Sequence, residues 1–268
     1  MITLPSARPS RVVVEPVRPV VDHGTFAAKA TLGEPMQVLA DVFADGHDVV
    51  DAVVTWRHVD AAGAATPWQE SPMVPLGNDR FEAWIVPDRL GRLEYDVVGW
   101  IDHLESWRRG VVKKVDAGLD VSVELLTGAM LLADVLDRAV SLDDDHSLGD
   151  HRLVKALRER LLAGDHSTLD DDHWTDVFAR TSPRTPSGRL PAPLRVDVDP
   201  LRGAFGAWYE FFPRSSVDAD VPPPRTLRDS IGRLDHIAEM EFDVVYLPPI
   251  HPIGLTNRKG RNGATTLA

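Results

Sequence analysis

The sequence contains no cysteine among its 268 residues. Disulfides, thiolate metal sites and cysteine nucleophiles are therefore excluded, and this composition fits a cytoplasmic protein. The histidines are scattered without an HxxxH or HExxH pair, so the sequence predicts no dedicated metal site. No apolar run reaches the roughly 18 residues of a membrane helix. Residues 1–10 lack the apolar stretch of a signal peptide, and we expect them to form a flexible lead-in.

Basic residues are scarce relative to acidic ones. The chain has 29 Lys and Arg against 41 Asp and Glu, which gives a formal net charge of −12 at pH 7. A wide nucleic-acid interface needs many cation–phosphate contacts, and the chain lacks the charge balance for it, so no nucleic-acid partner is expected. Binding to a membrane surface through basic residues is disfavoured for the same reason. The hydrophobic residues make up 43% of the chain, enough for the core of one or two globular domains.

Residues 11–117 predict an antiparallel β-sandwich made of short strands. Apolar residues alternate with others from Met36 to Phe43, and again from Leu93 to Ile101. Turn-forming residues, such as those at Asp45–Asp48, separate such segments, as is typical of sandwiches. The alternation returns at residues 194–198. We expect this strand to rejoin the sandwich, which would make the intervening segment an insertion.

Residues 118–180 predict a small helical bundle, because the apolar spacing changes to the helical period. Apolar residues recur at helical spacing from Leu125 to Ala139 and from Leu153 to Leu161. A third helix is expected to start at Ser167, with an N-terminal cap completed by Asp170, and to bury Trp174. Residues 181–193 contain four prolines and one glycine and are predicted to be a linker.

The third region, residues 204–268, begins as a strand–helix–strand unit. A short aromatic strand ends at Pro213, and a capped helix is expected to open at Thr226 and to carry Leu227, Ile231 and Leu234 on one face. A nearly continuous apolar strand follows at residues 242–247. This order predicts a βαβ unit with two parallel strands.

Ligands of such folds bind beyond the carboxyl ends of the strands. The loop after the second strand concentrates Arg258, Lys259 and Arg261 beside two glycines, which suits an anion such as phosphate. The alternative is a solvated surface loop, and the spacing is not that of a P-loop. His251 either contacts ligand or orders the loop.

The seven tryptophans invite a sugar-stacking interpretation, because an indole face packs against the apolar face of a sugar. Trp56, Trp84 and Trp100 lie in predicted strands, where a core position is favoured. Trp68 lies in a polar stretch and is the one expected to be exposed. The runs of three aspartates near residues 143 and 170 are interpreted as solvated charge rather than cation ligands.

Three segments, Ala204–Ser215, Arg233–Gly254 and Thr256–Asn262, resemble the bacterial maltose-1-phosphate-dependent α-1,4-glucan maltosyltransferases of the α-amylase superfamily. The resemblance implies an N-terminal antiparallel β-sandwich with an inserted helical bundle, followed by the first βαβ unit of a truncated (β/α)8 barrel. It implies retaining transfer of maltosyl units from α-maltose 1-phosphate to the non-reducing end of an α-1,4-glucan. It also implies a homodimer, with no cofactor and no metal.

The same resemblance limits which site residues this chain carries. Only 62 residues follow Gly206, whereas a (β/α)8 barrel needs about 250, so no catalytic Asp or Glu is assigned and the chain alone is expected to be an inactive fragment. Lys259 matches the family lysine that contacts maltose 1-phosphate, and Arg258 and Asn262 are secondary candidates. Gly263 stands where the family usually has asparagine. Two alternatives stay open: a non-catalytic glucan-binding or dimerisation module, and a split enzyme.

Overall fold

The computed structural model describes residues 10–138, 145–185, 187–213, 226–251, 256 and 259. The chain divides into two compact units, Met1–Asp199 and Pro200–Ala268, and each is described by itself.

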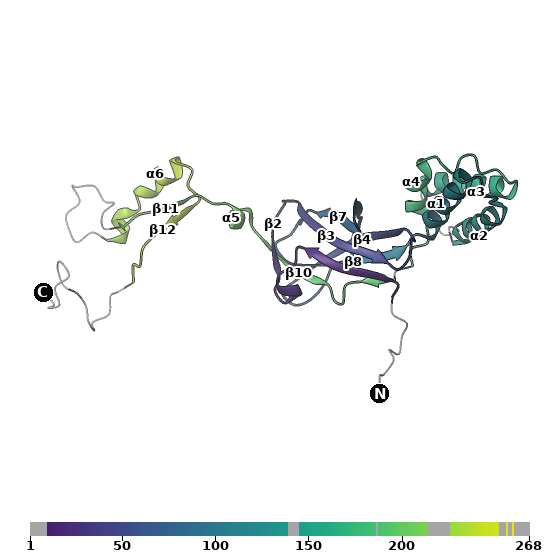
Figure 1. Cartoon of the computed structure of the whole chain (residues 1–268). Helices are drawn as coiled ribbons and strands as arrows, with labels where there is room; N and C mark the ends of the chain where they lie inside the picture. The colour runs from purple at the N-terminus through teal and green to yellow at the C-terminus, as the bar shows by residue number, and fades with distance from the viewer. Residues whose placement is uncertain are drawn as a thin grey trace, which may run out of the picture. The chain divides into compact units, whose positions relative to one another are not determined.

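Two β-sheets face one another in the first unit (Figure 1). The four-stranded sheet has the order β1 (Val12–Arg18), β3 (Met36–Ala44), β7 (Arg80–Ile85) and β6 (Val74–Gly77). The other sheet has the order β2 (Ala28–Thr31), β10 (Leu194–Asp199), β8 (Gly91–Ile101), β4 (Val50–Val59) and β5 (Gln69–Pro72), with β9 (Gly188–Arg189) also paired to β8. A short 3-10 turn, η1 (Asp22–Gly24), follows β1.

The sandwich core forms because alternate residues of each strand point between the sheets. On β3, Val38, Ala40 and Val42 are buried while Gln37 and Asp41 lie on the opposite face. All the strand pairs are antiparallel except β10 with β2. The strand predicted at residues 194–198 therefore lies inside the six-stranded sheet, between β2 and β8.

In the described part of the chain, a set of helices separates β8 from β9, and these helices pack on one another (Figure 1). They are α1 (His103–Asp116), α2 (Ser122–Arg138), α3 (Asp145–Leu162) and α4 (His173–Thr181). Their shared core includes Leu125, Leu132, Leu157, Trp174 and Phe178. The helices begin and end next to strands of one sheet, so the bundle is inserted in the sandwich.

Two predicted boundaries in this unit are wrong. The first run of sandwich strands stops at Ile101, and His103–Asp116 form α1 rather than sheet. The helical spacing of Leu104, Val111 and Val115 was hidden because Arg108 occupies an intervening buried position. The helix expected to start at Ser167 instead begins at His173, since residues 167–170 form turns.

The second unit contains α5 (Leu201–Ala204), β11 (Trp208–Glu210), η4 (Leu227–Ser230), α6 (Arg233–Glu239) and β12 (Val244–Tyr246). β11 and β12 pair in parallel, as predicted, with Trp208 opposite Val244 and Glu210 opposite Tyr246. Thr226 and Asp229 form the predicted reciprocal cap, but the capped segment is the 3-10 turn η4 and not the start of a long helix.

Candidate functional site

The loops after β11 and β12 are the first candidate site, because the carboxyl ends of parallel strands lie at the same edge of a sheet. Hydrogen bonds hold the strands together at both ends. Asp243 accepts a hydrogen bond from the Ala207 amide (2.9 Å), and the Phe211 amide donates to the Tyr246 carbonyl (3.3 Å). Tyr209 packs edge-on against Phe242, with ring centres 5.1 Å apart.

The structure places only one of the three predicted ligand residues. Lys259 is exposed, and Arg258 and Asn262 lie outside the described residues. His251, which follows β12, is also exposed. The described residues therefore do not bring these side chains together, and donor binding by Lys259 stays a prediction.

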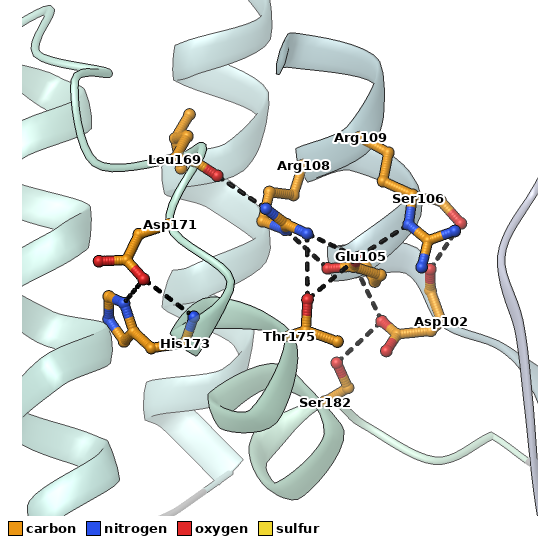
Figure 2. A network of polar contacts seen from close by, with 10 residues as sticks. All are labelled: Asp102, Glu105, Ser106, Arg108, Arg109, Leu169, Asp171, His173, Thr175 and Ser182. Carbon is orange, nitrogen blue, oxygen red and sulfur yellow. Dashed lines mark hydrogen bonds and ion pairs between the residues drawn. The ribbon is translucent and has the colours of Figure 1, made fainter. Parts of the chain in front are cut away.

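A second candidate is the polar network where the bundle joins the sheet (Figure 2). Asp102 directly follows β8 and caps α1 by accepting a hydrogen bond from the Glu105 amide (3.0 Å). Its carboxylate also accepts from the hydroxyl of Ser182, the residue after α4 (2.9 Å). The two ends of the inserted bundle are thus tied together through one aspartate.

Glu105 and Arg108 lie at the centre of this network and are almost fully buried (Figure 2). Arg108 donates two hydrogen bonds to the Glu105 carboxylate (2.8 and 2.9 Å), and Arg109 donates a third (2.8 Å). The remaining donors of Arg108 reach the Leu169 carbonyl (2.8 Å) and the Thr175 hydroxyl (3.0 Å). The guanidinium therefore connects α1 to the start of α4.

The lowered pKa of Glu105 indicates a structural role for this carboxylate. Burial raises its pKa, but the hydrogen bonds from Arg108 and Arg109 together outweigh burial, so the pKa lies below the ordinary value. A general acid needs the opposite shift, toward neutral pH. Because Arg108 also makes four hydrogen bonds within the bundle and the Glu105 carboxylate accepts three from arginines, the network holds the bundle together and is not a reaction centre.

Sequence reasoning missed this network, although one signal was present. The spacing Asp102–x–x–Glu105 is that of a helix N-terminus, where a side chain caps the first turn and an acid stands three residues on. Together with Arg108 and Arg109 one turn later, that signal predicts the start of α1 and the pairing of Glu105 with these arginines.

A cleft of about 570 Å³ lies between α1 and two turns of the sandwich. Arg109, Gly110 and Lys113 line one side, and the turns at residues 44–50 and 75–81 line the other. The two guanidinium groups in the lining are already paired, Arg109 with Glu105 and Arg80 with Asp41. The arginine charges of the lining are therefore neutralised within the protein, and Lys113 is the other Lys or Arg side chain of the lining.

The burial of the tryptophans agrees with the prediction except at one position. Trp100 is buried and Trp56 packs against the core, as expected, and Trp68 is exposed. The Arg57 guanidinium, however, lies 4.5 Å from the centre of the Trp68 ring and covers one of its faces. The prediction for Trp84 is wrong: its side chain is 50% exposed, because its position on β7 points away from the core.

Within the described part of the chain, no three or more His, Asp and Glu residues gather into a group that could hold a metal ion. The helices in those same ranges include none that is both long and apolar enough to cross a membrane.

Comparison with known proteins gives one consistent result. Residues 10–200 match the family model described as alpha-1,4-glucan:maltose-1-phosphate maltosyltransferase, domain N/S. The chain is 42% identical over 262 residues to the alpha-1,4-glucan:maltose-1-phosphate maltosyltransferase of Myxococcus xanthus, covering 96% of this chain and 39% of that protein. It is 40% identical over 267 residues to the same enzyme of Chlorobaculum tepidum, covering 95% and 37%. The chain thus spans about two fifths of the length of these relatives.

Proposed function

Because the chain belongs to the alpha-1,4-glucan:maltose-1-phosphate maltosyltransferase family, we propose that it forms the N-terminal part of an enzyme that transfers maltosyl units from α-maltose 1-phosphate to the non-reducing end of α-1,4-glucans. The family match over residues 10–200 carries this proposal. A cytoplasmic location stays a prediction from the cysteine-free composition.

We propose further that residues 204–268 open a (β/α)8 barrel. The parallel β11–α6–β12 unit has the connectivity with which such a barrel begins. Several large apolar side chains of this unit are exposed, which supports the proposal because the remaining strands and helices of a barrel would cover such surface. These side chains are Phe205, Trp208, Phe212, Ile231 and Ile250.

The chemistry itself would need residues beyond this part of the enzyme. Retaining transfer uses two carboxyl groups about 5 Å apart, one as nucleophile and the other as acid and base. The resemblance places these groups on later barrel strands, and no Asp or Glu of this chain corresponds to them. We therefore infer that the 268-residue chain alone does not catalyse transfer.

Lys259 is the residue of this chain that we assign to the donor. Lys259 is exposed and belongs to the segment that follows β12 in the chain, and it would pair with the phosphate of α-maltose 1-phosphate if that segment lies where ligands of such folds bind. Arg258 and Asn262 would assist. The other charges of the loop are cationic, which favours the same anionic donor.

The test uses a chimaera in which residues 1–268 replace the matching residues of the Myxococcus xanthus enzyme. We expect this chimaera to release phosphate from α-maltose 1-phosphate in the presence of a maltooligosaccharide. Lys259→Gln should raise the KM for the donor by about tenfold or more, since a charge-assisted hydrogen bond is lost. Lys155→Gln, at an exposed position of α3, is the matched control. Equal KM values in both variants would remove Lys259 from the donor site.

A dimerisation role is the second candidate, and one surface favours it. On α2, Val123, Leu126 and Met130 are all more than half exposed, at the i, i+3 and i+7 spacing of a helix–helix seam. A second copy of the chain would cover this stripe. Light scattering should show a dimer that Met130→Lys dissociates and Asp137→Lys, on the same helix, does not; a monomeric wild type would contradict this assignment.

A further inference from the structure

The outer face of the four-stranded sheet presents an open indole among hydrogen-bonding side chains. Trp84 of β7 is 50% exposed, whereas its neighbours Ala83 and Ile85 are buried in the sandwich core. Gln37 lies directly opposite Trp84 on β3. Exposure on a regular strand with a well-packed reverse side means that the indole belongs to a flat, fixed surface.

The orientation of the indole is held by a chain of hydrogen bonds across three strands. The Trp84 Nε1 donates to the Glu82 carboxylate. Gln37 Nε2 donates to the same carboxylate (3.2 Å), and Arg18 of β1 donates to Gln37 Oε1 (3.0 Å). The indole, carboxylate, amide and guanidinium therefore form one connected polar strip.

The basic groups of this face are engaged within the protein. Arg18 and Glu82 are linked through Gln37, and further along the face Arg80 donates two hydrogen bonds to Asp41 (2.7 and 2.9 Å). Glu15 of β1, opposite Asp41, adds one more acidic group. An anionic ligand would therefore find no arginine without a hydrogen-bond partner among the described residues of this face. An uncharged ligand with both an apolar face and many hydroxyl groups matches an indole bordered by planar donors and acceptors.

Trp68, the tryptophan that the sequence favoured for sugar stacking, is less suited to this role. The guanidinium over its ring belongs to Arg57, which is itself fixed by two hydrogen bonds to Glu94 (3.0 and 2.8 Å). A ligand would have to compete with this cation–π contact on one face of the ring. No comparable contact covers Trp84 among the described residues.

We propose that the face around Trp84 binds an α-1,4-glucan chain, with a glucose ring stacked on the indole and its hydroxyl groups bonded to Gln37 and Glu82. The identity of the glucan rests on the proposed function. The surface would hold a long acceptor on the sandwich, separate from the strand-end loops assigned to the donor. A single stacking platform binds weakly, so its effect should be seen with polymeric ligands, where many contacts act together.

The test is the mobility of the purified 268-residue chain in native gels containing glycogen, together with calorimetric titration of maltoheptaose. We expect glycogen to retard the wild-type chain. Trp84→Ala should weaken binding by about tenfold, because the stacking surface is lost. Trp68→Ala should bind like wild type. Gln37→Ala leaves the hydrogen bond between Trp84 and Glu82 intact and should weaken binding severalfold, because the amide that would bond to the sugar hydroxyls is lost. This variant tests the site even if the tryptophan variant fails to fold.

Absence of binding by wild type would overturn the proposal, as would binding that Trp84→Ala and Gln37→Ala leave unchanged. The readout requires no maltosyl transfer. If the chimaera is inactive but the chain binds glycogen through Trp84, the proposed enzyme is contradicted and this site is supported. If the chimaera is active but the chain does not bind glycogen, this site alone is contradicted.

Discussion

At the scale of single residues, the buried carboxylate of Glu105 has a large energetic consequence. Removing an ion from water costs several kcal/mol, and this cost is offset only when every hydrogen-bonding group is satisfied. Glu105 accepts from Arg108 and Arg109, and Arg108 also bonds to Leu169 and Thr175. The loss of any one member leaves another buried group without its partner.

We predict that Glu105→Ala lowers the free energy of unfolding by about 3–5 kcal/mol, because Arg108 stays buried without its counter-charge. Urea unfolding followed by circular dichroism measures this change. The control is Asp134→Ala, which removes an exposed ion pair with Arg138 on α2 and should cost less than about 1 kcal/mol. Similar losses in the two variants would show that the buried network contributes little.

The same residue predicts a dependence on pH. The folded-state pKa of Glu105 is lowered, so the unfolded chain takes up the proton first as the pH falls from the ordinary glutamate range toward that lower value. Its contribution to stability is therefore complete above this window and is lost within it. Burial raises the pKa of Asp96, which acts in the opposite direction, so the difference between two proteins is the informative quantity.

The stability gap between wild type and Glu105→Gln should accordingly be largest at neutral pH and shrink below the ordinary pKa of glutamate. Urea unfolding of both proteins at several pH values down to about 3.5 measures this gap. A gap that is constant, or that widens toward acid, would contradict the assigned ion pair.

At the scale of elements, α1 and α2 approach closely because α2 carries a glycine at the contact. A Cβ atom at Gly128 would lie 2.0 Å from Cζ2 of Trp107, and the indole also donates a hydrogen bond to the Glu124 carbonyl (2.7 Å). The ring is therefore fixed over the glycine by packing and by its polar end.

Gly128→Ala should destabilise the protein by about 1–3 kcal/mol, because overpacking against Trp107 outweighs the better helix propensity of alanine. Gly110→Ala is the matched control, since Gly110 lies within α1 and a Cβ there meets no atom within 4 Å. The control should gain about 0.5–1 kcal/mol. Thermal unfolding of both variants measures these stability changes. Stabilisation by Gly128→Ala would mean that the two helices do not pack through this residue.

The spacing of apolar residues was sufficient to locate some of the strands and helices. Period-two alternation located β3 and β8, and helical spacing located α2 and α4, because in each of them the buried face is nearly all apolar. The pattern failed for α1, where the charged Arg108 takes a buried position, and for Trp84, where an aromatic residue occupies an outward one. The failure at α1 comes from a tertiary ion pair, which local periodicity does not report. The failure at Trp84 comes from residue type, because the alternation of β7 puts Trp84 on the outward face with Arg80 and Glu82, whereas a large aromatic residue favoured a core position.

At the scale of the whole molecule, the order of sandwich strands, inserted helices and a parallel βαβ unit could be predicted, but the candidate site could not. The cationic loop around Lys259 suggested an anion from its residues alone, but the specific donor role of Lys259 was predicted only through a resemblance, because a cationic loop has no distinguishing geometry until its partners are placed. The tie between Asp102 and Ser182 joins positions 80 residues apart, and nothing in either local sequence indicates the other. A site formed by segments that are far apart in the sequence can be recognised only when the fold is known.

The most direct test of the account compares phosphate release from α-maltose 1-phosphate, with maltohexaose as acceptor, by the 268-residue chain and by the chimaera that adds the remaining part of the Myxococcus xanthus enzyme. We expect the chimaera to release phosphate and the 268-residue chain to release no more phosphate than a heat-treated control. Turnover by the chain alone, or a folded chimaera without activity, would contradict the claim that this chain is the non-catalytic N-terminal part of a maltosyltransferase.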